Sequence, residues 1–183
     1  MARSEISIQK RDEAEWLDFL LETWHSARSA EFRRRRPSLL TRYQPGVYVV
    51  ESPVAMLDFA AEARENGYFV AWVNGKSITS HEAFLADVSR RLQFPAYFGQ
   101  NWDAFEECIR DLDWLPARGY VLVLDGFDWF ARSDPKNWKI GLDVLEEAVN
   151  TWSRTRTPMY VLLHGPRDGA PGVKELRCAD HKV

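Results

Sequence analysis

Three short runs of almost unbroken apolar residues constrain the fold of this chain more than any other feature. The runs cover residues 68–73 (YFVAWV), 120–124 (YVLVL) and 159–163 (MYVLL). Strands of this character are typical of parallel sheets, because helices cover both of their faces. A shorter run, residues 47–50 (VYVV), precedes them. We therefore predict a small parallel sheet of three core strands, with a fourth strand contributed by residues 47–50.

Segments with helical periodicity separate these runs. Residues 53–65 are rich in alanine, a helix is expected to begin after Ser80, and further helices are expected over residues 101–112 and 137–154. Parallel strands that alternate with helices are joined by crossovers, which place the helices on the faces of the sheet. The predicted fold class is α/β, with helices packed on a small parallel sheet.

The chain outside this pattern divides into two segments. Residues 1–45 include a helical pattern over residues 12–31 and a run of arginines, and we interpret them as an N-terminal helical extension with an arginine-rich linker. The apolar stripe of the extension indicates that it docks on the domain or on another copy of the chain. Residues 46–165 form the predicted domain. Residues 166–183 are rich in glycine, proline and charge, and we expect a flexible tail.

Composition narrows the class of protein. The 183-residue chain is 45% hydrophobic and can bury a core, and its net charge of −3 argues against a general binder of nucleic-acid backbones. Cys108 and Cys178 are too sparse for a disulfide framework. The first residues lack the apolar run of a signal peptide, and no apolar stretch is long enough to span a bilayer. We expect a cytoplasmic protein that binds no cofactor, no metal and no membrane.

The helix predicted over residues 101–112 has two opposed faces. Its apolar stripe, which should face the core, consists of Trp102, Phe105, Ile109 and Leu112. The opposite stripe is acidic and consists of Asp103, Glu107 and Asp111, with Glu106 and Arg110 beside it. Like charges four residues apart on a helix repel each other, so the acidic stripe costs some helix stability. A plain solvated face is the simplest interpretation of these acids alone.

The loop before this helix favours a binding surface instead. Tyr97, Phe98 and Gly99 place aromatic rings and a conformationally permissive residue beside the acids, and Asn101 is suited to cap the helix. Carboxylates can replace phosphate groups and a ring can replace a base, so this surface could imitate a fragment of RNA. Residues 99–113 carry five acids and one arginine, a net charge of −4, and such a concentrated field steers a basic partner.

The segment FPAYFGQNWDAFEECIRDL, residues 94–112, resembles the signature of the barstar family. The shared pattern is a tyrosine–aromatic–glycine loop, an Asn-x-Asp-Ala helix start, and an acid followed by a cysteine. The order of strands and helices over residues 67–164 is also similar to that of the family. The resemblance implies a small α/β inhibitor that binds a guanyl-type ribonuclease, a partner that can be a toxin, and occludes its active site.

The resemblance also implies roles for single residues. Asp103 and Glu107 match the two main acidic contact positions of the family, Tyr97 and Gly99 match its loop contacts, and Cys108 matches a structural or accessory cysteine. The complete partner-binding set that we expect is Tyr97, Phe98, Gly99, Asn101, Trp102, Asp103, Glu106, Glu107 and Asp111. The family prototype has an aspartate at the position of Glu107 and an aromatic residue at that of Glu106. These departures indicate a partner other than the prototype's nuclease.

Two other classes of function stay open from the residues alone. Asp103 and Glu107 could form the acid–base pair of an enzyme, but the four histidines are scattered and no metal-ligand, phosphate-loop or nucleophile motif occurs. The acidic helix could also bind a basic partner that is not a ribonuclease, in an immunity or regulatory protein. Direct binding of nucleic acid is disfavoured, because the acids carry the charge of phosphate. We expect a monomer or a weak homodimer.

Overall fold

The computed structural model describes residue 23 and residues 38–177. The chain divides into two units, residues 1–36 and residues 37–183, and the elements below belong to the second. Apart from Thr23, the helix predicted over residues 12–31, its docking and the arginine-rich linker lie outside the described residues. The helices and strands are α3 (Leu39–Arg42), β1 (Gly46–Val50), α4 (Pro53–Glu65), β2 (Phe69–Asn74), η1 (Gly75–Ser77), α5 (His81–Arg91), α6 (Trp102–Asp111), β3 (Tyr120–Asp125), α7 (Asp128–Ser133), α8 (Pro135–Ser153), β4 (Met159–His164), η2 (Arg167–Gly169) and β5 (Lys174–Glu175).

The strands form one parallel sheet in the order β2-β3-β4-β1-β5. The predicted fourth strand is confirmed, because β1 pairs in parallel with β4 and places Val47 opposite Val161. β1 has a second neighbour, the short strand β5, which pairs with it at Tyr48 and Val49. The predicted α/β class is therefore confirmed, and the sheet has one strand more than expected.

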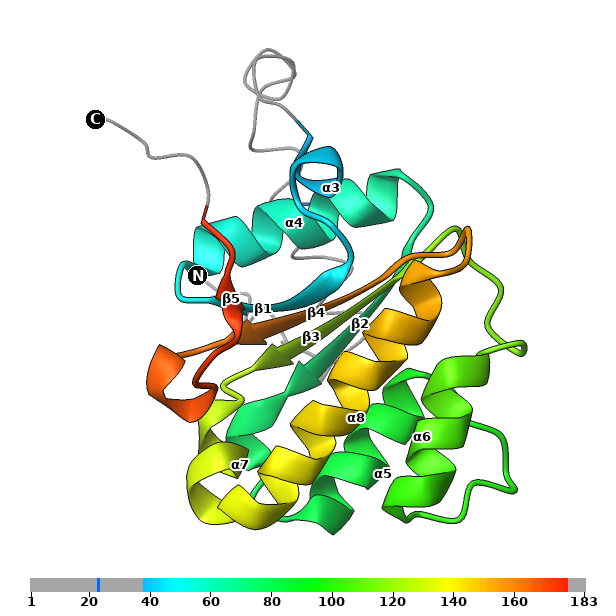
Figure 1. Ribbon diagram of the computed structural model, residues 1–183, viewed down its shortest axis with the longest axis vertical. Coiled ribbons are helices and arrows are strands. Elements are labelled where there is room, and N and C mark those ends of the chain that lie inside the picture. Colours follow the sequence, from blue (N-terminus) through cyan, green and yellow to red (C-terminus); the bar gives the residue numbers. More distant parts are fainter. Residues whose placement is uncertain (1–22, 24–37, 178–183) are drawn as a thin grey trace, which may run out of the picture. The chain divides into compact units, whose positions relative to one another are not determined.

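Helices cover both faces of the sheet (Figure 1). α4 lies on one face and α5, α6 and α8 lie on the other, so each face buries an apolar cluster of its own. Alternate residues of β3 supply the two clusters: Val121 faces α4, and Leu122 faces the other helices. β2 stands at the edge of the sheet, and its Val70 and Trp72 are only half-buried. None of the helices in the described ranges is both long and apolar enough to cross a bilayer.

Side-chain caps fix where the helices begin. Ser52, Ser80, Asn101 and Asp134 stand directly before α4, α5, α6 and α8, and each accepts a hydrogen bond from the backbone N–H three residues later. These bonds satisfy amides that have no partner inside the helix. The cap predicted at Asn101 is confirmed, and it sets the first turn of the acidic helix at residue 102.

Glu62 of α4 anchors the segment that leads into the sheet. Its carboxylate accepts hydrogen bonds from the hydroxyl of Ser38 and, at 3.0 Å, from the backbone N–H of Leu39, so it caps α3 from outside. The hydroxyl of Tyr160 on β4 donates to the backbone oxygen of Tyr43 at 3.1 Å. Burial, followed by the charges of nearby tyrosines and Glu62, raises the pKa of Tyr160 to about 12. Residues 38–43 are therefore held on the α4 side of the sheet.

Two short helices, α3 and α7, have no counterpart in the sequence analysis. α7 contains six residues, too few for a periodic pattern to reveal a helix. Its Asp128 is only 7% exposed and forms an ion pair with Arg132 one turn later. The exposed fraction of Trp129 is 49%, so α7 also presents one large ring to the solvent.

The segment after β4 corrects another prediction. Residues 166–183 are expected to form a flexible tail, yet residues 166–177 turn through η2 and add β5 to the sheet. Val173 and Leu176 are 5% and 2% exposed, and the backbone N–H of Leu176 donates to the oxygen of Val49 at 2.9 Å. Scattered apolar residues thus gain burial against an open sheet edge, which outweighs the local preference for irregular chain. Residues 178–183 lie outside the described residues, and the predicted domain boundaries stay a prediction.

The folded tail predicts a loss of stability in Leu176→Ala. Removing this buried side chain should lower the free energy of unfolding by about 2–5 kcal/mol, because transfer and cavity terms add. The control is Lys174→Ala, at an exposed position two residues earlier, which should change the free energy of unfolding by less than about 0.5 kcal/mol. Urea unfolding followed by circular dichroism measures both. Equal and small effects would mean that the tail does not contribute to the core.

Candidate protein-binding site

The apolar stripe of α6 packs into the domain, as its spacing predicts. The buried residues are Phe105, Ile109 and Leu112, each 0% exposed. Two tryptophan N–H groups tie α6 to α8: Trp152 Nε1 donates to the backbone oxygen of Ile109 at 2.9 Å, and Trp102 Nε1 donates to Asn137 Oδ1 at 3.1 Å. Because α6 is tied to the same helix near both of its ends, its rotation about its own axis is fixed.

This rotation leaves the acidic stripe in the solvent. Asp103, Glu107 and Asp111 are all exposed. Together with Glu106, Arg110 and Thr151 of α8, they line an open depression of about 600 Å³. No local sequence pattern marks Thr151 as part of this surface, because it lies about forty residues after α6 in the chain. The depression is concave, acidic and wide, which suits a protruding cationic group of a protein.

One ion pair crosses this depression. Arg110 Nη1 lies 2.7 Å from Glu106 Oε1, and both side chains are 40% exposed. A glutamate four residues before an arginine is the favourable order on a helix, worth about 0.2–0.5 kcal/mol in stability. The pair neutralises Glu106 in part, whereas no ion pair within the described residues involves Asp103, Glu107 or Asp111.

The loop before α6 presents one tyrosine to the solvent. Tyr97 is 74% exposed, whereas the next ring, Phe98, packs edge-on against Phe94 with 5.1 Å between ring centres. Loss of hydration, and then the charges of Cys108, Asp111 and Asp113, raise the pKa of Tyr97 above its usual value. The loop therefore presents the ring and the hydroxyl of Tyr97 to the solvent.

Asn101 shapes the junction of loop and helix. Its Oδ1 accepts from the Ala104 N–H at 2.9 Å, and its Nδ2 donates to the backbone oxygen of Gly99 at 3.3 Å. The residue between them, Gln100, has φ of 48°, in the left-handed region that few side chains adopt. A Cβ on Gly99 would stand 3.2 Å from the Asn101 amide, so glycine keeps this turn close to the helix start.

The structure thus separates the predicted site residues into two groups. The first group is accessible to solvent: Asp103, Glu106, Glu107 and Asp111 line the depression, and Tyr97 and Gly99 are exposed in the loop before them. Phe98 and Trp102 are half-buried against the core, and Asn101 caps the helix. The second group holds the first in place, and a direct contact of either group with a partner stays a prediction.

Cys108 lies on the buried side of the same helix. It is 4% exposed, and burial, followed by the charges of Glu107 and Asp111, raises the pKa of its thiol. A nucleophilic cysteine needs a lowered pKa and access to solvent. Cys108 has neither property and serves as a small apolar residue under the acidic stripe.

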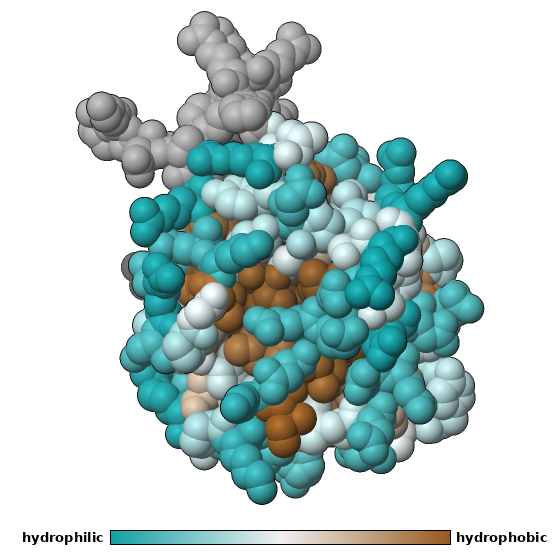
Figure 2. All heavy atoms as spheres, viewed as in Figure 1, coloured by the Kyte–Doolittle hydropathy of each residue, from teal (hydrophilic) through white to brown (hydrophobic). Residues whose placement is uncertain are grey.

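Three other kinds of feature among the described residues can indicate a functional site: a histidine–aspartate contact, a group of metal-ligating side chains and a second depression. Nδ1 of His164 lies 2.6 Å from Asp125 Oδ1 at the carboxyl ends of β4 and β3, and this contact links the two strands. No group of three or more metal-ligating side chains occurs among the described residues. A second depression of about 290 Å³, between the start of β1, the end of α8 and residues 172–174, is lined by apolar side chains such as Val47 and Val149 and by polar ones such as Glu146. Apolar side chains do reach the surface in the middle of the side shown in Figure 2.

Comparison with known families decides the relationship. A family model described as Barstar (barnase inhibitor) matches residues 68–164, slightly more than half of the chain. The chain belongs to the barstar family. No curated protein matches it. The match begins one residue before β2 and ends with β4, so it contains the loop and α6 in full. β1, α4 and β5 lie outside the match, and β1 and β5 extend the sheet beyond β4.

The environment of Cys108 predicts slow thiol chemistry. In a Cys178→Ala background, alkylation by neutral iodoacetamide near pH 8.5, about the pKa of a free thiol, should be much slower than that of a cysteine peptide. Glu107→Gln should speed the reaction, because it removes one charge that opposes the thiolate. Glu82→Gln on α5 is the matched control and should leave the rate unchanged. A rate equal to that of the peptide would contradict the buried position.

Proposed function

We propose that this protein inhibits a ribonuclease by covering its active site with α6 and the loop before it. Membership of a family of barnase inhibitors supports the inhibitor class. The observation that carries the proposal is the pair of unpaired, exposed carboxylates of Asp103 and Glu107, one turn apart on the side of α6 that faces away from the core.

The chemistry of a ribonuclease active site explains why carboxylates are needed. Such a site is a cleft of basic side chains that stabilises phosphate charge. The carboxylates of Asp103 and Glu107 enter this cleft and replace phosphate oxygens in charge-assisted hydrogen bonds. The ring of Tyr97 lies where a base would stack, and Gly99 lets the backbone of the inhibitor approach closely. The inhibitor thus imitates an RNA fragment that cannot be cleaved.

The residues around Asp103 and Glu107 support the binding of a basic nuclease. Asp111 extends the negative field along α6, and Glu106 contributes once its pair with Arg110 rearranges. Asn101, Phe98 and Trp102 hold the contact residues and add the exposed parts of their own surfaces. Because the protein has a total charge of −3 and residues 99–113 carry −4, the field is concentrated at this site and steers a basic partner. We place the encounter in the cytoplasm, where an inhibitor protects its producer from a ribonuclease toxin.

Replacement of the acids tests the proposal. Asp103→Ala and Glu107→Ala should each weaken inhibition by about 2–5 kcal/mol, the range for truncating one member of a buried charge pair. That range includes the barnase–barstar complex, so it is carried over from this family. The melting temperature should hardly change, because both side chains lie opposite the core. Glu82→Ala on α5 is the control and should inhibit like the wild type.

The measurement uses two sources of ribonuclease. The first is purified barnase, titrated against a fixed amount of RNA substrate; the departures at Glu106 and Glu107 predict that it is inhibited more weakly than the cognate nuclease. The second is an extract of the producing organism, from which the immobilised protein should capture ribonuclease activity that high salt releases. Inhibition and capture by the acid variants at wild-type strength would show that the stripe is only a solvated face. Capture of a basic protein without ribonuclease activity would favour an immunity or regulatory protein of another kind.

A further inference from the structure

A second charged surface borders the acidic stripe at the amino ends of the strands. Arg118 stands in the loop that leads to β3, and Arg154 and Arg156 stand in the loop that leads to β4. These two loops touch, because the Tyr120 N–H donates to the backbone oxygen of Pro158 at 2.9 Å. All three arginines are exposed, and we call them the arginine rim.

The arginines of the rim differ from several other arginines of the domain, which form ion pairs on their own helix. Arg90, Arg110 and Arg132 each form an ion pair with an acid three or four residues earlier on the same helix. By contrast, no ion pair joins the arginine rim to any residue that the structure describes. Exposed cations that have no counter-charge among the described residues can bind an anionic group.

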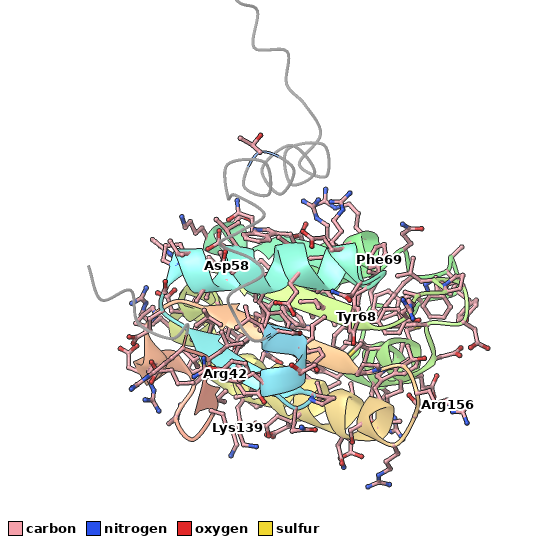
Figure 3. The ribbon with its side chains drawn as sticks, turned by 90° about the horizontal axis from the view of Figure 1, so that it is seen from above. Arg42, Asp58, Tyr68, Phe69, Lys139 and Arg156 are labelled. Atoms are coloured by element: carbon pink, nitrogen blue, oxygen red, sulfur yellow. The ribbon has the colours of Figure 1, made fainter. Side chains whose placement is uncertain are left out.

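The rim and the acidic stripe lie side by side. Thr151, which lines the acidic depression, precedes Arg154 by less than one turn of helix. The hydroxyl of Tyr120 at the start of β3 donates to the backbone oxygen of Leu115 at 2.9 Å, which ties the segment just after the exposed Asp111 and Asp113 to the same strand end. Figure 3 shows Lys139 and Arg156 at opposite ends of α8, with Arg156 on the outside of the domain.

We propose that two copies of this chain associate through this surface, with the acidic stripe of each copy on the arginine rim of the other. Adjacent patches of opposite charge are self-complementary, because a two-fold axis between them pairs acid with arginine twice. The acidic stripe spans about 12 Å from Asp103 to Asp111 at 1.5 Å per residue, so it can meet several cations at once. Tyr97, the most exposed large apolar side chain among the described residues, stands in the loop before α6 and can stack on a guanidinium of the other copy.

The self-association regulates the site of the proposed function. It covers the same acids that would enter a ribonuclease, so a second copy and the nuclease compete. Only this consequence rests on the proposed function; the association itself does not. Exposed ion pairs contribute little each and are screened by salt, so the dimer is weak and reversible. A nuclease that buries the acids displaces the second copy.

Charge inversion of the full-length chain tests the geometry. One variant combines Glu107→Arg with Asp111→Arg, and the other combines Arg154→Glu with Arg156→Glu. In sedimentation at about 0.01 M salt, where the Debye length is roughly 30 Å, the wild type should form a dimer that dissociates at about 1 M. Each variant alone should raise the dimer dissociation constant at least about tenfold, because like charges then face each other.

The mixture of the two variants gives the decisive result. Their inverted patches complement each other on both sides of the axis, so a heterodimer should form that neither variant forms alone. This rescue excludes any effect of the arginines at residues 33–36, which both variants keep. Thermal melts confirm that each variant is folded. If the inverted rim does not fold, the milder pair Arg154→Gln with Arg156→Gln should still weaken the dimer, because it removes the cations that face the acidic stripe.

The outcomes separate this inference from the proposed function. A wild type that stays monomeric at low salt, or a mixture that does not associate, overturns the dimer. Loss of binding to a labelled RNA oligonucleotide by the rim variant, with no dimer in the wild type, would assign the rim to nucleic acid instead. If the dimer forms but no ribonuclease is captured, only the proposed function fails. If ribonuclease is captured by a protein that never dimerises, only this inference fails.

Discussion

Burial of the sheet on both faces is the interaction on which the rest of the structure depends. β3 and β4 present apolar side chains to either side, so they are stable only where a helix lies above and another lies below. Parallel pairing of β2, β3, β4 and β1 satisfies this need, because each crossover carries a helix across one face. The position of α6 follows from this arrangement: it fills the layer beside α8, and the tryptophan bonds to Ile109 and Asn137 fix its rotation.

The candidate site follows from the same packing. Phe105 and Ile109 of α6 point into the core. Asp103 and Glu107 lie on the opposite face of the same helix, so they are exposed to solvent. Repulsion along the acidic stripe costs a few tenths of a kcal/mol per pair, which is small against the burial of one aromatic ring. The fold therefore tolerates a cluster of carboxylates that nothing in its own stability requires. A surface of this kind can be shaped by its partner with little loss of fold stability.

The net charge of this protein is small, but its charged side chains are grouped into separate acidic and basic patches. The total is close to neutral, yet the acids of α6 and the arginines at the strand ends form neighbouring patches of opposite sign. Such a pattern attracts a basic cleft in one orientation and disfavours others, because misplaced contacts bring like charges together. Arg110 lies inside the acidic depression, and this one cation among the carboxylates further restricts the orientations in which a basic partner can bind.

The sequence by itself determined the local structure. Apolar runs located β1 to β4, cap residues such as Asn101 located the helix starts, and helical spacing separated the two faces of α6. The family signature over residues 94–112 indicated the inhibitor class. All of these depend on neighbours within a few turns of chain, and such patterns can be read along the sequence.

Only the tertiary structure decided the features that join distant segments. It placed Thr151 beside the acids, set Phe98 and Trp102 against the core, and brought the loops of Arg118 and Arg156 together. It also folded residues 166–177 onto β1, against the local preference of a segment rich in glycine and proline. Leu176 is ordered because β1 leaves an open edge and an apolar surface for it, and no pattern within the tail itself can report that partner.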